Sequence, residues 1–279
     1  MTSSKDNFFI GWSDQTPEGS AQASRRFVYW LLPAIVLVLF LFVSGQQVFT
    51  NSFYDFGNST PLSGVLYKSP VPILRIILGP DQTGQAITQD ILLIGAGKFG
   101  AEPTIAAMEA EQGQNLEGQP IQLEGVVSYY DGKVSLELLG GPSAFKGKAR
   151  LQPMDAGQAA FRPLGDRTLK GEIVDSKCFF GLMKPGEGKT HRSCAVRCLS
   201  GGIPPVFAAN TAEDRYYILR GPSGESINQE LLPYVADYLQ IEGRAERRGD
   251  WNILYLDPVA GICTLGPKWV FGGMPMCGE

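Results

Sequence analysis

The sequence predicts a mainly β protein in which a single N-terminal transmembrane helix is followed by two tandem OB-like β-barrels. Three observations lead to this fold class: one long apolar run near the N-terminus, a weak internal repeat in the rest of the chain, and a turn-rich composition. The chain has 279 residues, of which 44% are hydrophobic, and it contains 34 glycines and 19 prolines. Such a composition favours a body of short strands and turns over a helical bundle.

The apolar run extends without interruption from Phe27 to Val43. A helix over this run is about 26 Å long, which is just enough to cross the hydrocarbon core of a bilayer. Arg25 and Arg26 precede the run, and the next basic residue after it is Lys68. Because basic residues stay on the cytoplasmic side, we expect a single-pass anchor in the inner (cytoplasmic) membrane. The bilayer is then one partner, and the C-terminal part of the chain lies outside the cytoplasm, in the periplasm.

A cleaved signal peptide is the alternative for the same segment. The sequence Val43-Ser44-Gly45 could serve as a cleavage site, and Ser24-Arg25-Arg26-Phe27 loosely resembles a twin-arginine signal. The apolar run is longer than a usual signal-peptide core and follows a polar head of 24 residues, which favours an uncleaved anchor. Both interpretations export the body of the protein, where disulfides are permitted.

A weak internal repeat predicts that the body consists of two similar domains. Leu62-Ser-Gly64-Val matches Leu169-Lys-Gly171-Glu, and Ile121-Gln-Leu-Glu-Gly125 matches Leu239-Gln-Ile-Glu-Gly243. In both copies the second block leads into a hairpin marked by a Gly/Asp turn dipeptide. We expect each copy to contain three strands, a short helix and two further strands, which is the order of the OB fold.

The predicted helices span residues 103–112 in the first copy and 226–238 in the second. The predicted boundaries are a cytoplasmic tail at 1–24, a transmembrane anchor at 25–45, a tether at 46–60, OB-like domain 1 at 61–141, a linker at 142–167, OB-like domain 2 at 168–257 and a Cys/Met-containing tail at 258–279.

The second copy carries an insertion that holds three of the five cysteines and the only histidine. A short helix with Thr190 as its N-cap would place His191, Cys194 and Cys198 on one face, and Cys178 would arrive from a loop rich in glycine and proline. Three thiolates and an imidazole suit Zn²⁺, or Cu(I) because of the thiolates. The sequence therefore predicts a metal site formed by Cys178, His191, Cys194 and Cys198.

Two other interpretations of the cysteines stay open, because an exported thiol can be oxidised. Structural disulfides would pair Cys178 with Cys194 or Cys198, and Cys263 with Cys277, leaving one thiol over. A redox-active protein would use Cys194 or Cys198 as nucleophile, with the single histidine as base.

The motif Asp175-x-x-Cys178, a glycine-rich loop, His191-x-x-Cys194-Ala-x-x-Cys198 and Gly202-x-Pro204 resembles a family of exported bacterial OB-like domains of unknown function. The resemblance covers residues 168–257, about a third of the chain. It implies an exported OB-like domain with a Cys/His motif, and it brings no assigned activity.

The stretch Gly95-Ala-Gly97-Lys98-Phe99-Gly100 is a literal G-x-G-x-x-G sequence, the pattern of dinucleotide-binding turns. The repeat instead places it in a strand-to-helix turn of the first copy, and the matching loop Gly221-Pro-Ser-Gly224 lacks the pattern. We therefore expect a flexible turn here. The net charge of −4 argues against a nucleic acid as partner.

These expectations combine into a membrane-anchored extracytoplasmic accessory protein, or a subunit of a membrane or respiratory complex, whose partners are other membrane protein subunits. Its second domain would hold a metal-binding or disulfide-stabilised Cys/His site. An exported thiol oxidoreductase and a purely structural scaffold with disulfides are the two alternatives.

Overall fold

The computed structural model describes residues 18–45, 51–55, 57–150, 161–181, 183–265 and 277. The chain divides into two compact units, Met1–Thr50 and Asn51–Glu279. Most of the predicted N-terminal tail, part of the predicted linker and most of the C-terminal tail lie outside the described residues.

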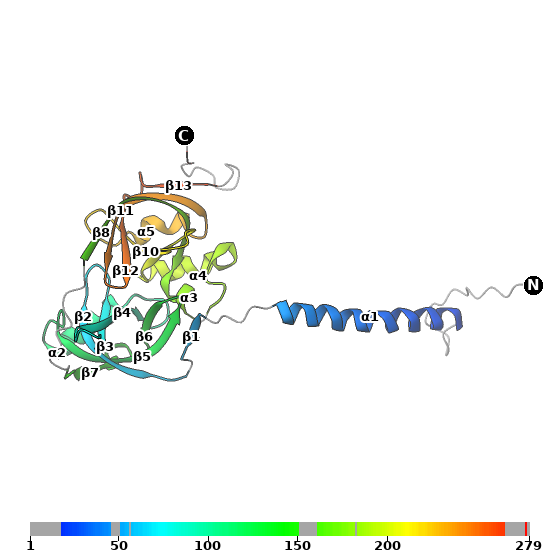
Figure 1. The fold of residues 1–279 in the computed structure, drawn as a ribbon, viewed down its shortest axis with the longest axis horizontal. Coiled ribbons are helices and arrows are strands. Elements are labelled where there is room, and N and C mark those ends of the chain that lie inside the picture. The colour runs from blue at the N-terminus through cyan, green and yellow to red at the C-terminus, as the bar shows by residue number, and fades with distance from the viewer. Residues whose placement is uncertain are drawn as a thin grey trace, which may run out of the picture. The chain divides into compact units, whose positions relative to one another are not determined.

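Helix α1 (Glu18–Gly45) contains the whole apolar run (Figure 1). None of its side chains is buried within the protein, and its most apolar window has a mean hydropathy of 2.5. By length and composition it can cross a membrane, although an N-terminal signal sequence has the same properties. The helix begins earlier than the predicted anchor, because residues 18–24 are also helical. Pro33 lies inside it, as helices in membranes tolerate.

The second unit contains two closed five-stranded β-barrels, which confirms the predicted fold class. In barrel 1 the strands close in the order β2-β3-β4-β6-β5, and β5 returns to β2. Strands β4 and β6 are parallel and all other neighbours in the ring are antiparallel. The elements are β2 (Thr60–Tyr67), β3 (Ile73–Pro80), β4 (Ala86–Gly95), α2 (Glu102–Gln112), β5 (Pro120–Tyr130) and β6 (Lys133–Leu138).

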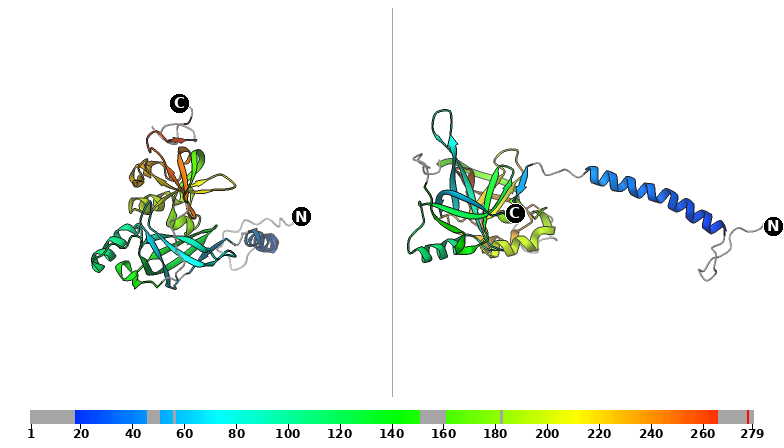
Figure 2. Two further views of the ribbon diagram at one scale, coloured as in Figure 1. Left: turned by 60° about the vertical axis from the view of Figure 1, so that its left-hand side comes forward. Right: turned by 90° about the horizontal axis from the view of Figure 1, so that it is seen from below.

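Barrel 2 repeats this topology strand for strand, with the ring β8-β9-β10-β12-β11 and a parallel β10–β12 pair. Figure 2 shows the two barrels from two further directions. In barrel 2, two helices lie between the first strand and the second, at the position where the sequence predicts the insertion. The elements are β8 (Phe161–Asp175), α3 (Ser176–Phe180), α4 (Gly188–Ser200), β9 (Pro205–Ala209), β10 (Tyr216–Arg220), α5 (Asn228–Leu231), the 3₁₀ helix η2 (Leu232–Tyr234), β11 (Tyr238–Arg248) and β12 (Trp251–Tyr255).

The glycines of the internal repeat have a shared structural role. A Cβ atom on Gly64 would lie 2.4 Å from the carbonyl oxygen of Arg75, and one on Gly171 would lie 2.1 Å from that of Ala208. Both glycines are in the first strand of their barrel, where the second strand crosses closely. Close packing between the first two strands of each barrel therefore explains why both copies of the repeat have a glycine at this position.

Some local predictions differ from the structure. The helix expected at 226–238 is only α5 and η2, because Pro233 cannot donate the backbone hydrogen bond that a continuing α-helix needs. Three short elements flank the barrels: β1 (Ser52–Tyr54), η1 (Gly141–Ala144) and β7 (Phe145–Lys148). Strand β1 falls in the predicted tether, while β7 and the start of β8 fall in the predicted linker. A last strand, β13 (Ile262–Thr264), pairs with β11.

A third apolar cluster joins the two barrels, in addition to the core of each. Leu92 and Ile94 of barrel 1 pack in it with Phe180 and Trp251 of barrel 2. A hydrogen bond from a side chain to the backbone also connects the barrels: the indole nitrogen of Trp251 donates to the carbonyl oxygen of Asp90 over 3.1 Å. The insertion helices lie at this junction, so their side chains are positioned by both barrels.

Candidate functional site

Helix α3 fixes the first cysteine. Asp175 ends β8 in an extended conformation, and its Oδ1 accepts a hydrogen bond of 2.7 Å from the backbone nitrogen of Cys178. This side chain is an N-cap, which satisfies a donor that the helix itself cannot pair. The two following residues, Phe179 and Phe180, are buried between the barrels. Cys178 is consequently held at the junction, with 5% of its surface exposed.

Helix α4 presents the other two thiols. Cys194 and Cys198 are four residues apart and share one face of the helix, which packs into the inter-barrel cluster. Ala195 and Leu199 face the core of barrel 2 instead. The helix ends before Gly201, as the sequence predicts, but its N-cap is Glu187, so Thr190 lies inside the helix and does not cap it.

The structure brings the three thiols together. The Sγ atoms of Cys178, Cys194 and Cys198 all lie within 4.8 Å of one another, and Cys178 Sγ is 3.8 Å from Cys194 Sγ. None of the three is in a disulfide. Cys178 and Cys198 are buried, and Cys194 is partly exposed. We call these three residues the thiol cluster.

Barrel 1 supplies a cation to the thiol cluster, which the sequence did not predict. The Nζ of Lys98 donates a hydrogen bond of 2.9 Å to Cys194 Sγ and lies 3.6 Å from Cys198 Sγ. Lys98 belongs to the G-x-G-x-x-G stretch between β4 and α2. An ammonium group at this distance favours the charged thiolate over the neutral thiol.

Close packing against the end of α4 explains why this loop is rich in glycine. The nitrogen of Gly100 donates to the carbonyl oxygen of Gly201 over 3.0 Å, and a Cβ atom on Gly201 would lie 1.8 Å from the carbonyl oxygen of Lys98. Strand β4, which leads into the loop, belongs to a closed barrel and pairs antiparallel with β3. The setting is therefore not the helix-flanked parallel sheet that a dinucleotide-binding turn requires.

His191 lies beside the thiol cluster in a second group of potential ligands. Its Nε2 is 3.0 Å from Oδ2 of Asp175, and these two side chains form a mutually close group with Cys178. The four residues predicted as one metal site are thus divided into two overlapping groups that share Cys178. Asp175 is an additional member that the sequence showed only as the first residue of the resemblance motif.

Hydrogen bonding within the thiol cluster sets the protonation order. A hydrogen bond to Cys198, together with burial, raises the pKa of Cys178 above its ordinary value. The same bond lowers the pKa of Cys198, and the positive charge of Lys98 lowers it further. In turn, the hydrogen bond to Cys194 raises the pKa of Lys98. The cluster therefore favours a Cys198 thiolate close to a charged ammonium group, and Cys178 ionises after Cys198.

A cavity of about 200 Å³ reaches the cluster at Cys178. Ile94 and Glu137 of barrel 1 line it on one side, and Cys178 and Met183 of barrel 2 line it on the other. The Sδ of Met183 lies 4.0 Å from the Sγ of Cys178. Nothing in the sequence pattern distinguishes this methionine from one that only packs.

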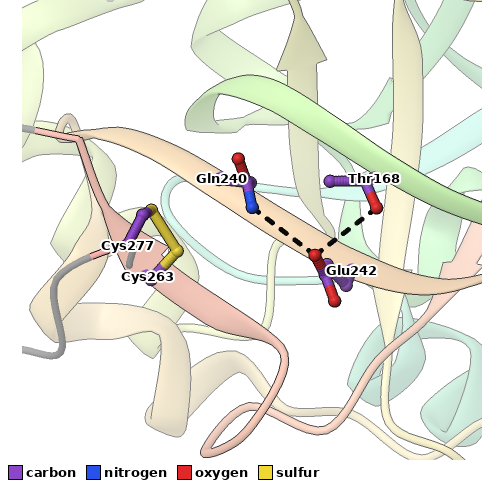
Figure 3. Close-up of a disulfide and its surroundings, with 5 residues drawn as sticks. All are labelled: Thr168, Gln240, Glu242, Cys263 and Cys277. Carbon is purple, nitrogen blue, oxygen red and sulfur yellow. Dashed lines mark hydrogen bonds between the residues drawn. A yellow bond between two sulfur atoms is a disulfide. The ribbon is translucent and has the colours of Figure 1, made fainter. Parts of the chain in front are cut away.

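The fourth and fifth cysteines form a disulfide, Cys263–Cys277, as one of the sequence interpretations expects (Figure 3). Cys263 lies in β13 at the edge of barrel 2, and the backbone nitrogen of Cys277 donates to the carbonyl oxygen of Thr264. The alternative pairing of Cys178 with Cys194 or Cys198 is not present. The disulfide ties the C-terminal end of the chain to barrel 2.

The fold and the site define a protein with two tandem OB-like barrels, a thiol cluster at their junction and one apolar N-terminal helix. No family model matches the chain, and no curated protein or solved structure matches it either.

Proposed function

We propose that the protein is a membrane-anchored extracytoplasmic accessory protein, or a subunit of a membrane or respiratory complex, that binds a thiophilic metal ion, Zn²⁺ or Cu(I), at the thiol cluster. In this proposal helix α1 stays uncleaved in the cytoplasmic membrane and both barrels lie on the periplasmic side. The barrels belong with the exported OB-like domains that the Cys/His motif resembles.

One observation carries the metal-binding proposal: three reduced sulfur atoms converge from two helices. Sulfur ligands at about 2.3 Å from a shared ion lie about 3.8 Å apart in a tetrahedral site and about 4.0 Å apart in a trigonal one. The measured distance of 3.8 Å between Cys178 Sγ and Cys194 Sγ agrees with this spacing. Three thiolates carry an excess of negative charge over either ion, and Lys98 offsets part of it.

The fourth ligand has one candidate from the sequence, His191. Its hydrogen bond to Asp175 is the carboxylate–histidine pairing that commonly orients a metal-binding imidazole. His191 is grouped with Cys178 and not with all three thiols. It would therefore approach the ion from the Cys178 side.

A thiol oxidoreductase is the second candidate, because Cys178 and Cys194 are near neighbours and Lys98 promotes a thiolate. Closing a disulfide would require their sulfur atoms to approach from 3.8 Å to about 2.05 Å. The two electrons and the two thiol protons released would have to pass to a disulfide or quinone of a partner.

Metal analysis and thiol counting on the full-length protein in detergent test the proposal. Protein purified without oxygen should hold about one metal ion per chain, and after chelation it should expose three free thiols, the number outside the disulfide. Replacing Cys194 by Ser should abolish metal retention, whereas replacing Cys263 and Cys277 together should leave it intact. A protein that takes up no metal overturns the proposal, and a single free thiol under oxidising conditions favours the oxidoreductase.

A further inference from the structure

We infer that the thiol cluster is specific for Cu(I), and that the thioether of Met183 is its fourth sulfur ligand at the entrance through which the ion arrives. This inference rests on the proposed metal-binding function and names the ion and the path. It follows from the cavity beside Cys178, the position of Met183 and the ligand preferences of the two candidate ions.

Met183 lies next to the thiol cluster, on the side of Cys178. Its Sδ is 4.0 Å from Cys178 Sγ, about the same spacing as between the thiols themselves. With 54% of its surface exposed, it can contact an incoming ion before the buried Cys178 and Cys198 do. The thioether is uncharged, so it can stay at the surface without a partner and without the proton release that thiols require.

The loop that carries Met183 is held against the site. Lys184, the next residue, donates to the carbonyl oxygen of Phe179 and places its Nζ 3.6 Å from the centre of the Tyr130 ring. A Cβ atom on Gly186 would lie 2.5 Å from the Cα of Phe179, so the loop backbone packs directly on α3. These contacts fix the methionine near the cluster and leave its side chain at the surface.

The cavity has the size of an ion path. Its volume of about 200 Å³ is below the range of roughly 300–1,000 Å³ that is typical of sites for organic ligands. Met183 and Cys178 both line it, and their sulfur atoms are 4.0 Å apart, so an ion that enters can pass from the exposed thioether to the buried thiol. A stepwise exchange of soft ligands fits this arrangement.

The donor set distinguishes the two ions. Thiolates bind both Zn²⁺ and Cu(I), but thioether sulfur is a ligand of Cu(I), whereas Zn²⁺ completes its four-coordinate sites with histidine or carboxylate. His191 would be the fourth ligand for Zn²⁺ and Met183 for Cu(I). Met183 lines the cavity that reaches Cys178, and His191 is not among the residues that line it, which favours Met183.

Competition with chromogenic chelators tests the inference on the full-length protein in detergent, under reducing and oxygen-free conditions. The probes are Cu(I) and Zn²⁺ alone, and the variants are Met183→Leu, His191→Ala and Met108→Leu. Met108 is buried in the core of barrel 1 and is the matched control for the loss of a thioether. Leucine keeps the apolar volume, and the melting temperature of each variant shows that it is folded.

We expect Met183→Leu to weaken Cu(I) binding about tenfold, equivalent to about 1.4 kcal/mol, and to leave Zn²⁺ binding unchanged. Met108→Leu and His191→Ala should leave Cu(I) affinity within about twofold of the wild type, which is less than the effect of losing a direct ligand. X-ray absorption of the Cu(I) form should show only sulfur neighbours.

Equal Cu(I) affinities of Met183→Leu and Met108→Leu would overturn the inference. The inference would also be overturned if the wild type binds Zn²⁺ but does not bind Cu(I) tightly, and His191→Ala loses the Zn²⁺ binding. The proposed metal-binding function would stand in that case. A wild-type protein with three reduced thiols that binds neither ion would overturn the proposed function and this inference together.

Discussion

At the scale of single residues, the thiol cluster depends on one side chain from the other barrel. Lys98 is the only cation of the described residues with a hydrogen bond to the cluster thiols. Its ammonium group compensates negative charge that the apolar junction could not otherwise solvate. A substitution at this single position therefore tests the electrostatics of the whole site.

Replacing Lys98 by Gln should slow the reaction of the cluster thiols with an alkylating agent at neutral pH by about tenfold. The reactive species is the thiolate, and the variant loses the positive charge that favours it. Alkylation rates followed by mass spectrometry on the reduced, metal-free protein give the measurement. Lys148→Gln removes an exposed charge from the same barrel and should have no effect, and equal rates in both variants would contradict the role of Lys98.

A buried tyrosine in barrel 2 predicts a pH dependence of stability. The hydroxyl of Tyr255 donates to Oε1 of Glu246 over 2.8 Å, and burial together with this bond raises its pKa to about 12. In the unfolded chain a tyrosine ionises near pH 10. Between about pH 10 and 12 the folded state therefore retains a proton that the unfolded state has lost, and the free energy of unfolding falls as the pH rises.

The variant Tyr255→Phe should have a shallower alkaline slope than the wild type, by at most about 1.4 kcal/mol per pH unit, because other tyrosines such as Tyr216 also have raised pKa values. Near neutral pH it should be less stable by about 1 kcal/mol, because Glu246 loses a donor in a buried position. Denaturant unfolding at a series of pH values from 8 to 11 measures both effects. Tyr238→Phe, at a half-exposed position, should keep the wild-type slope; an unchanged slope in Tyr255→Phe would refute the assignment.

Residue types predicted part of the site, and contacts across the chain completed it. Cys178, His191, Cys194 and Cys198 were visible as a local cluster with helical spacing. Lys98 was not, because it lies about eighty residues before Cys178 and only the docking of the barrels brings it to the thiols. His191 is grouped with Asp175 and Cys178, and not with all three thiols. Its contact with Asp175 could not be predicted from the spacing of the residues.

At the scale of elements, the end of α4 and the loop between β4 and α2 form one packed unit. Gly201 has φ −83° and ψ 2°, a conformation that is open to alanine as well as to glycine. Only the missing side chain matters there, since a Cβ atom would lie 1.8 Å from the carbonyl oxygen of Lys98. The glycine is thus a spacer that allows barrel 1 to reach the thiol cluster.

The variant Gly201→Ala should be destabilised by about 2 kcal/mol or more, because the new methyl group must displace packed backbone. The loop should move away, so Lys98 should withdraw from Cys194 and thiol alkylation should slow as in Lys98→Gln. Unfolding in denaturant and the alkylation rate provide the two readouts. Ser200→Ala, the neighbouring exposed position, is the control, and a Gly201→Ala stability within about 0.5 kcal/mol of it would show that the contact is unimportant.

The same elements show why secondary structure was easier to predict than docking. Alternating apolar residues and turn dipeptides defined the β5–β6 and β11–β12 hairpins, since these features are local. The G-x-G-x-x-G stretch was ambiguous, because a glycine-rich turn has the same composition whether it approaches a phosphate or another backbone. Only the contact with Gly201 distinguishes the two.

At the scale of the whole molecule, the internal repeat predicted two similar barrels, and the structure explains what the repeat conserves. Gly125 and Gly243 occupy matching places in the fourth strand of each barrel, where a Cβ atom would meet the carbonyl oxygen of Glu137 or Tyr255 at 2.3 or 2.4 Å. The insertion that carries the cysteines leaves this scaffold intact. Only one copy of the duplicated fold carries the cysteines, which is consistent with a functional role for the site.

Membrane orientation is the remaining whole-molecule prediction. Arg25 and Arg26 precede the apolar part of α1, and no basic residue follows before Lys68, so the barrels should lie outside the cytoplasm. A reporter that is active only outside the cytoplasm should work when fused after Glu279, and the Cys263–Cys277 disulfide should form in the same cells, because an oxidising compartment permits it. Activity of a cytoplasmic reporter at the same position would reject this orientation.

A second experiment distinguishes an uncleaved anchor from a signal peptide. An uncleaved protein should stay in washed membranes and should yield an N-terminal peptide that precedes Arg25, since cleavage after the apolar run would release both barrels.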